Sequence, residues 1–311
     1  MDGKALMLGV ASLLALVVGL RRLGARHYTD ASSRYDPQSY PQSAKDWQET
    51  VQRNLLQGTS FLGVIDGNGA VDTQHRHGRR STLIYIPPTF DPTRPWTLVY
   101  YFHGLTGFKL GKDVPGGGYE RDWMPATILD AQSLGENFVI VFPEMPWSYH
   151  TVTPTKRQRS VFDGTSDEDF LVWDRGVRTV LSQDFGISTP PAHQIYIGHS
   201  AGGSTLRAIS NSGALNSNPP DLIIWSDAAY GTWLDEFYRN FINDRNTEVV
   251  MFNLVDTSAT KPYKQTLRFI AQSGKPASLE VKTFTYGDGW YHRKIGYNAL
   301  RMAFEHLRTG K

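Results

Sequence analysis

Residues 194–210 read QIYIGHSAGGSTLRAIS, and this stretch decides the fold class. A short β-rich apolar run comes first, then Gly198-His199-Ser200-Ala201-Gly202-Gly203, then a run of small residues with helical character. A strand that turns sharply into a helix needs small residues at the turn, because the two backbones pass closely there. Such a turn lifts its central side chain above the sheet edge at a helix N-terminus. Ser200 is therefore the candidate nucleophile, and a purely structural glycine-rich turn is the alternative.

Similar apolar runs alternate with amphipathic helical patterns along the rest of the chain. Several runs are continuously apolar, as expected of strands that are covered on both faces of a parallel sheet. This alternation predicts an α/β fold with a mostly parallel sheet and helices on both faces. The first two strands are expected to form an antiparallel hairpin. The predicted strands are 60–66, 82–87, 97–103, 138–143, 194–198, 222–226, 249–254 and 279–285.

Composition narrows the class of protein. The 311 residues carry 32 Lys and Arg against 30 Asp and Glu, a net charge of +2, which argues against a nucleic-acid-binding protein. The absence of cysteine excludes disulfides, thiolate zinc sites and a cysteine nucleophile. We predict three regions: a hydrophobic segment at 1–25, a linker at 26–57 and one catalytic domain at 58–311.

Residues 5–20, ALMLGVASLLALVVGL, contain no charge and lie between Lys4 and the pair Arg21 and Arg22. Sixteen helical residues span about 24 Å, which is short of the hydrocarbon core of a bilayer. The segment is either a marginal membrane anchor or the core of a signal peptide. The positive flank favours an anchor, so we expect the chain to be membrane-anchored or exported, with the side of the membrane open.

A serine nucleophile needs a general base, and chain order in this type of site places the histidine last. Two histidines follow Ser200. His292 lies in the loop between the last predicted strand and a final helix predicted at 293–308. His306 lies near the end of that helix, where a surface histidine favoured by the helix C-terminus is the simpler interpretation. We therefore predict His292 as the base.

The orienting acid has more than one candidate. Asp256 follows the seventh predicted strand, the usual place for this carboxylate, and is the first choice. Asp227 follows the sixth strand and is the second, and Asp288 is a weaker third. The aspartate that is not used is expected to cap a loop by binding backbone N–H groups.

The oxyanion hole needs two backbone N–H groups that point at developing negative charge. Ala201, the residue after the nucleophile, supplies one of them. The loop after the third strand reads Tyr101-Phe102-His103-Gly104-Leu105, and Leu105 is the predicted second donor.

Together the His103-Gly104 turn, the Gly198–Gly203 turn, a strand-end aspartate and the late His292 resemble the α/β-hydrolase superfamily over residues 58–308. The layout is similar to its esterase, feruloyl-esterase and polyester-depolymerase-like members. The resemblance implies about eight strands in the sheet and an acyl-enzyme mechanism without a metal or other cofactor. It does not identify the substrate, because this superfamily supports many reactions.

Loops at the carboxyl ends of parallel strands form the binding cleft in such folds. The long segment 144–166 contains two aromatic residues, Trp147 and Tyr149, that we expect to contact an apolar or sugar-like substrate group. Lys156, Arg157 and Arg159 in the same segment would favour a negative group or an anionic membrane surface. Further expected substrate-binding residues are His103, Gly104, His199, Tyr230 and Trp290.

We therefore expect a serine hydrolase of carboxylic esters, acting on a small-molecule or polymer ester. Two alternatives remain open at this point. The same residues can run an amidase or peptidase acting on cell-envelope material, and the scaffold can also be a catalytically silent binding protein.

Overall fold

The computed structural model describes residues 59–65, 71–72, 82–104, 128, 131–143, 167–241, 246–255 and 260–310. The predicted hydrophobic segment and linker lie outside these ranges. No helix within the described ranges is long and apolar enough to cross a membrane.

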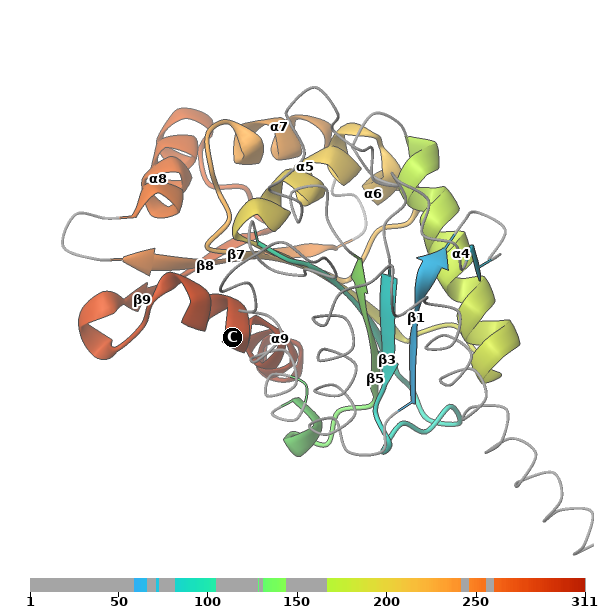
Figure 1. Cartoon of the computed structure of the whole chain (residues 1–311). Coiled ribbons are helices and arrows are strands. Elements are labelled where there is room, and N and C mark those ends of the chain that lie inside the picture. Colours follow the sequence, from blue (N-terminus) through green and yellow to red (C-terminus); the bar gives the residue numbers. More distant parts are fainter. Residues whose placement is uncertain are drawn as a thin grey trace, which may run out of the picture.

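One twisted sheet organises the molecule (Figure 1). Its strands lie in the order β2-β1-β3-β5-β4-β6-β7-β8-β9. Neighbouring strands are parallel throughout the part β5-β4-β6-β7-β8-β9. The remaining pairs, β2 with β1, β1 with β3 and β3 with β5, are antiparallel. The strands are β1 (Thr59–Ile65), β2 (Val71–Asp72), β3 (Thr82–Ile86), β4 (Thr97–Phe102), β5 (Phe138–Pro143), β6 (His193–His199), β7 (Leu222–Ser226), β8 (Glu248–Val255) and β9 (Leu279–Thr285).

The prediction of a mostly parallel α/β sheet is confirmed, and all eight predicted strands are present. The ninth strand is β2, a two-residue pairing on the outer edge of β1. Two residues are too few to produce an alternating or continuous apolar pattern, so the sequence did not indicate this strand.

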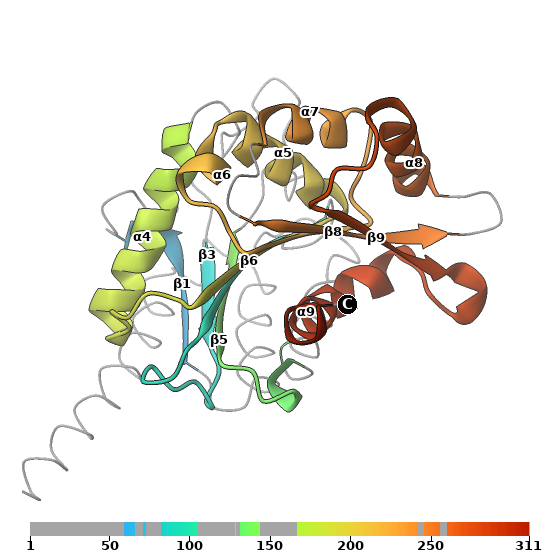
Figure 2. The same cartoon turned by 180° about the vertical axis from the view of Figure 1, so that it is seen from behind.

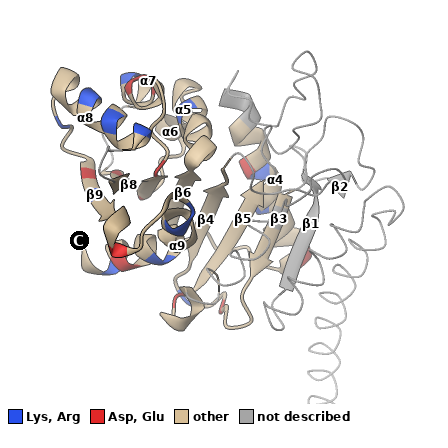
Figure 3. Ribbon diagram, turned by 60° about the vertical axis from the view of Figure 1, so that its left-hand side comes forward, with Lys and Arg blue, Asp and Glu red and all other residues tan. Residues whose placement is uncertain are grey.

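The central strands are apolar because both of their faces are covered. Every residue of β4, β5 and β7 is buried. None of these strands, nor β6, contains Lys, Arg, Asp or Glu, and charged residues lie mainly on the helices (Figure 3). Figures 1 and 2 show α4, α5, α6, α7 and α8 on one face of the sheet and α9 on the other. The helices are α4 (Asp167–Phe185), α5 (Gly203–Asn211), α6 (Ala214–Ser217), α7 (Trp233–Asn240), α8 (Lys261–Ser273) and α9 (His292–Thr309).

Two apolar clusters hold these layers together. The larger lies between the sheet and the five helices and includes Trp173 of α4 and Phe237 of α7. The smaller lies under α9 and includes Phe304 packed against Phe138 of β5, with ring centroids 5.2 Å apart. Burying about 150–250 Å² per aromatic side chain makes these contacts a large part of the packing free energy. The position of α9, which begins at His292, is therefore set by the core.

His306 corrects one sequence-based interpretation. Its side chain is only 2% exposed, so it is not a surface histidine. Nε2 lies 2.6 Å from Oε2 of Glu248 at the start of β8, and the ammonium of Lys282 in β9 lies 3.2 Å from Nδ1. The helix end is covered by the amino-terminal ends of two strands, a contact that position along the helix does not reveal.

Candidate active site

The turn after β6 has the predicted strand-turn-helix form. A short 3₁₀ turn, η3 (Ser200–Gly202), links β6 to α5. Ser200 has φ of 52°, a left-handed conformation that few non-glycine residues adopt. Strain of this kind persists only where the surrounding structure enforces it, and it is concentrated at functional sites.

Close packing explains why the turn needs small residues. A Cβ atom at position 202 would fall on the backbone carbonyl of Phe102 in β4, far inside contact distance. Any larger residue there would push the turn away from the sheet. On the other side, a Cβ at Gly104 would lie only 3.1 Å from Cβ of Ser200. The His103-Gly104 loop therefore passes directly beside the candidate nucleophile.

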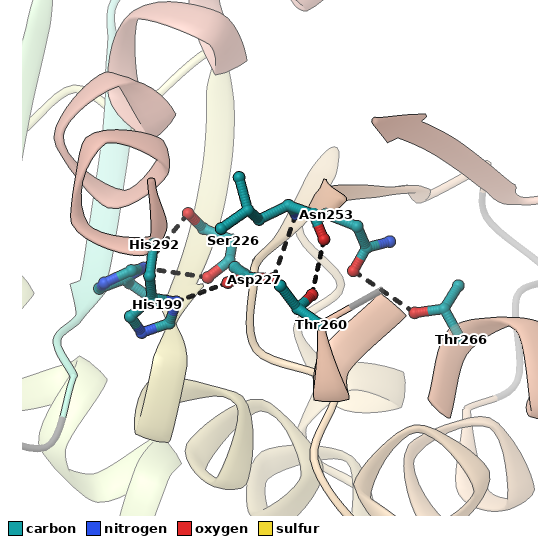
Figure 4. Close-up of polar contacts among 8 residues, drawn as sticks. His199, Ser226, Asp227, Asn253, Thr260, Thr266 and His292 are labelled. Atoms are coloured by element: carbon teal, nitrogen blue, oxygen red, sulfur yellow. Dashed lines mark hydrogen bonds and ion pairs between the residues drawn. The ribbon is translucent and has the colours of Figure 1, made fainter. Parts of the chain in front are cut away.

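The structure brings His292 together with Asp227 (Figure 4). Nδ1 of His292 lies 2.5 Å from Oδ2 of Asp227. Because a carboxylate accepts, the imidazole carries its proton on Nδ1 and offers Nε2 as the basic nitrogen. The Asp227 side chain is 2% exposed and that of His292 is 36% exposed. The acid is thus buried behind a base that is open to solvent.

Backbone geometry aims Asp227 at the histidine. Asp227 directly follows β7 and has φ of 46°. Its N–H donates to the carbonyl of Phe252 at 2.6 Å, and its Oδ1 accepts from the N–H of Leu254 at 3.2 Å. Both partners belong to β8, so the neighbouring strand fixes the turn and one carboxylate oxygen. The second oxygen remains for His292.

Of the two main candidate acids, the structure describes only the second choice, Asp227, at this contact. Asp256 lies outside the described residues, and the carboxylate that binds Nδ1 of His292 belongs to Asp227. β7 and β8 are adjacent parallel strands, so both aspartates follow strands that end at the same edge of the sheet. Strand order along the chain did not distinguish them, whereas the turn at Asp227 does. The third candidate, Asp288, lies in the exposed 3₁₀ turn η4 (Tyr286–Asp288).

The end of β8 is itself tied down (Figure 4). Thr260, the residue before α8, donates its hydroxyl to the carbonyl of Leu254 at 2.6 Å. The residue whose N–H holds Asp227 is therefore fixed on its carbonyl side as well. This chain of hydrogen bonds connects α8, β8 and the acid.

His199 lies against the base. The centroid of its ring is 4.7 Å from that of His292, with 33° between the planes. The side chain is buried, and Nδ1 donates to the carbonyl of Ser226 at 3.0 Å. Burial, followed by the charge of His292, holds the pKa of His199 well below 6.5. The ring is therefore neutral; His199 directly precedes Ser200, and its ring lies against His292.

Tyr230 reaches the site from the same loop as Asp227. Its hydroxyl is close enough to Ser200 to be influenced by it, and its ring packs edge-on against Trp233 at 5.7 Å between centroids. Burial, reinforced by the Asp227 charge, raises the pKa of Tyr230 to about 12. The phenol thus stays protonated near neutral pH and can donate a hydrogen bond. Tyr230 was predicted from the sequence as a substrate-binding residue, and that role stays a prediction.

The other predicted site residues divide into two groups. Ala201 occupies η3 directly after Ser200, and His103 is buried with Nδ1 donating to the carbonyl of Gly104 at 2.7 Å. Trp290 packs on Phe284 of β9, with centroids 4.5 Å apart, as part of the cluster under α9. Leu105, Trp147 and Tyr149 lie outside the described residues, as do the basic residues 156–159.

The described residues contain no group of three or more His, Asp or Glu side chains that could hold a metal ion. Among the described residues, the carboxylate at the site is that of Asp227, which binds His292 and Leu254. The chemistry available at this edge is that of a serine, an imidazole–carboxylate pair and hydrogen-bond donors.

The strand order and the turn at Ser200 identify an α/β-hydrolase fold, with the chain order Ser, Asp, His. No protein-family model matches the chain. No curated protein matches it either.

Several solved structures are similar to the chain. A predicted CIB-like hydrolase from Thermoplasma acidophilum aligns over 81% of this chain and 99% of its own, at 16% identity and a TM-score of 0.47. The siderophore hydrolase EstA from Aspergillus nidulans aligns over 79% and 93%, at 11% identity and a TM-score of 0.49. An esterase from Pyrobaculum calidifontis aligns over 86% and 91%, at 11% identity and a TM-score of 0.44.

Proposed function

We propose that the chain is a serine hydrolase that cleaves carboxylic esters through an acyl-enzyme on Ser200. The observation that carries the proposal is the short hydrogen bond from His292 Nδ1 to the buried carboxylate of Asp227. It fixes the tautomer in which Nε2 accepts a proton, and the His292 ring lies against His199, the residue before Ser200. The strained φ of Ser200 supports the same assignment.

In the proposed reaction, Oγ of Ser200 attacks the ester carbonyl carbon while its proton moves to Nε2 of His292. The tetrahedral intermediate collapses, the ester C–O bond breaks, and the leaving alcohol takes the proton from His292. Water then attacks the acyl carbon while His292 takes a proton from it. The bond to Ser200 Oγ breaks, His292 returns the proton to that oxygen, and the carboxylic acid is released. Asp227 keeps the imidazole in its tautomer and stabilises the imidazolium, without being protonated itself.

Negative charge that develops on the carbonyl oxygen needs donors close to Ser200. The N–H of Ala201 is the first of these in the proposal, because it follows the nucleophile in the turn. The loop after β4 supplies the second, with Leu105 as the donor predicted from the sequence. The approach of Gly104 to Ser200 supports the placement of that loop.

Labelling of the full-length protein with a fluorophosphonate probe tests the proposal. Wild type is expected to react covalently at Ser200, and Ser200→Ala and His292→Ala are expected to lose the reaction. Ser212→Ala, at the far end of α5, and His193→Ala, an exposed histidine at the start of β6, are the matched controls and should react like wild type. Absence of labelling in folded wild type would favour the binding-scaffold alternative.

A substrate panel then separates the two enzyme alternatives. An esterase should hydrolyse p-nitrophenyl esters and leave the matched anilides intact. Hydrolysis of both, with similar kcat/KM, would favour the amidase or peptidase alternative.

A further inference from the structure

Helix α9 contains a glycine, Gly296, in its interior, where glycine does not stabilise a helix. Gly296 lies four residues after His292, so the two residues are neighbours on one face of the helix. A glycine in a helix interior is destabilising relative to alanine. The position therefore needs a reason outside the helix.

The reason is the ring of His199. A Cβ atom at position 296 would lie 2.7 Å from both Cε1 and Nδ1 of His199 and 2.8 Å from its Cδ2. Almost the whole imidazole thus rests on the bare backbone of α9, one turn below the catalytic base. We call this contact the His199 notch; it consists of the His199 ring and the helix surface at Gly296.

Both sides of the notch are anchored to the sheet. On one side, Nδ1 of His199 donates to the carbonyl of Ser226 at 3.0 Å, and the Ser226 hydroxyl lies 3.4 Å from the same nitrogen. On the other side, the hydroxyl of Tyr101 donates to the carbonyl of Gly296 at 2.9 Å. The depth at which α9 settles on the sheet is therefore set by the thickness of one imidazole ring.

The depth of α9 on the sheet affects the orientation of the His292 ring. The hydrogen bond to Asp227 fixes Nδ1 but leaves the ring free to tilt about that bond. The face of His199, 4.7 Å away between centroids, limits the tilt from below. Two contacts together, one polar and one with a ring face, define where Nε2 points.

We propose that His199 is a positioning residue for His292: its ring, seated in the notch at Gly296, sets the height and tilt of the base relative to Ser200. The inference rests on the proposed function for its catalytic consequence, and it makes a structural claim that can be tested separately. The groups that face His199 are His292, His103, Ser226, Gly104 and Gly296.

The charge state of His199 suits this role. The donor bond to the Ser226 carbonyl places the proton on Nδ1. Burial first, and then the charges of His292 and His103, hold the pKa of His199 well below 6.5. A neutral ring can remain beside His292 when the base takes up the serine proton, whereas a second imidazolium would repel it.

A double-mutant cycle tests the notch. The rate of fluorophosphonate labelling is measured for wild type, His199→Ala, Gly296→Ala and the double variant. Displacement of a catalytic group by about 1 Å can cost about 10²-fold in rate, so we expect a loss of that order in Gly296→Ala and about tenfold in His199→Ala. In the double variant the new methyl group occupies space that the ring has vacated. Its rate should therefore stay within about threefold of His199→Ala.

The result that overturns the proposal is additivity. If the two residues act independently, the double variant should lose about 10³-fold, the product of the single losses. A Gly296→Ala protein with the wild-type rate would overturn it as well. His306→Asn is the matched control, because it removes a buried histidine from the other end of the same helix, and it should label at the wild-type rate.

A second pair of variants covers the case in which Gly296→Ala does not fold. His199→Phe keeps a ring and loses the donor, whereas His199→Asn keeps a donor and loses the ring. If the ring seats the helix, His199→Phe should label faster than His199→Asn. Any other ranking would show that the hydrogen bond to Ser226, and not the ring, is what matters, and would overturn the proposal.

A readout without turnover separates failure of this inference from failure of the proposed function. In the Ser200→Ala background, the proton NMR spectrum reports the downfield resonance of the His292–Asp227 hydrogen bond. Gly296→Ala should shift or broaden this resonance, and His306→Asn should leave it unchanged. An unchanged resonance in Gly296→Ala overturns the positioning role whether or not the wild type is labelled.

Discussion

The two ends of α9 each carry a histidine paired with a carboxylate, and the two pairs have opposite burial. At the first residue of the helix, His292 is 36% exposed and its partner Asp227 is 2% exposed. Near the last turn, His306 is 2% exposed and its partner Glu248 is 59% exposed. The N···O distances are almost the same, 2.5 and 2.6 Å. Distance alone therefore does not distinguish a candidate catalytic pair from a structural one.

The difference lies in which nitrogen is left for chemistry. His306 has a carboxylate at Nε2 and an ammonium at Nδ1, so both ring nitrogens are occupied inside the protein. His292 uses Nδ1 for a buried acid and presents the rest of its ring toward the nucleophile turn. A buried acid with an exposed base can pass a proton to a substrate, whereas a buried imidazole with an exposed acid can only hold the helix end in place.

The largest expected effect comes from changing the acid of the exposed-base pair. Asp227→Asn should lower kcat by about 10⁴-fold with little change in fold, because an amide that donates to Nδ1 stabilises the wrong tautomer. Steady-state ester hydrolysis and circular dichroism measure the two quantities. Asp256→Asn is the matched variant and should retain most of the activity. If Asp256→Asn has the larger effect, the pairing at His292 does not represent the working site.

At the other end of α9 the effect should fall on stability and not on turnover. His306→Ala removes a buried hydrogen-bonded ring and should lower the free energy of unfolding by about 1–3 kcal/mol. Urea denaturation measures this change. kcat at a temperature where the variant is fully folded should stay close to the wild-type value. A loss of activity beyond tenfold in the folded variant would mean that the two ends of the helix are not separate in function.

The third prediction concerns how the free energy of unfolding depends on pH through His199, the neutral histidine beside the site. Burial holds the pKa of His199 well below its unfolded value of 6.5, so the unfolded chain binds this proton more readily than the folded one. Its contribution to stability is present above about pH 6.5 and is lost as the pH falls. The limiting slope is about 1.4 kcal/mol per pH unit for one proton.

His199→Phe carries no proton at this position and should lack that part of the acid-side slope. Unfolding free energies measured from pH 7 down to pH 5 for the two proteins give the difference directly. Parallel curves for wild type and His199→Phe would contradict a neutral, buried His199.

The smallest expected effect concerns the Tyr230 hydroxyl, which lies near Ser200. We expect this hydroxyl to donate one hydrogen bond at the site, worth about 0.5–1.5 kcal/mol, so Tyr230→Phe should lower kcat/KM by roughly twofold to tenfold. Tyr238→Phe, at a partly buried tyrosine of α7 that packs against Phe269 of α8, is the matched control. A gain of activity in Tyr230→Phe would mean that the phenol holds Ser200 in an unreactive position.

Much of the fold could be predicted from local pattern. Eight strands were correctly placed because β-rich runs of five to seven residues, several of them continuously apolar, with helical patterns between them, have few alternatives to a covered parallel sheet. The turn at Ser200 was recognisable because close backbone approach requires small residues in a fixed order. β2 was not predicted, because a strand of two residues is too short to show a pattern of apolar residues.

The candidate site was less predictable, and the reason is geometric. Asp227 and Asp256 are both placed after neighbouring strands, and only the left-handed turn at Asp227 and its bonds to β8 aim one carboxylate at His292. The link between His199 and Gly296 joins residues 97 positions apart, and its one sequence signal was a glycine four residues after the candidate base.

The sequence by itself determined the class of sheet, the position of the strand-turn-helix at Ser200 and the histidine that follows the last strand. These features depend on side-chain period, small residues and chain order, which are local properties. Only the tertiary structure decided which acid meets His292, why His306 is buried and what supports the base from below. Those contacts depend on where strand ends and helix ends meet in space, and packing between distant segments sets that meeting point.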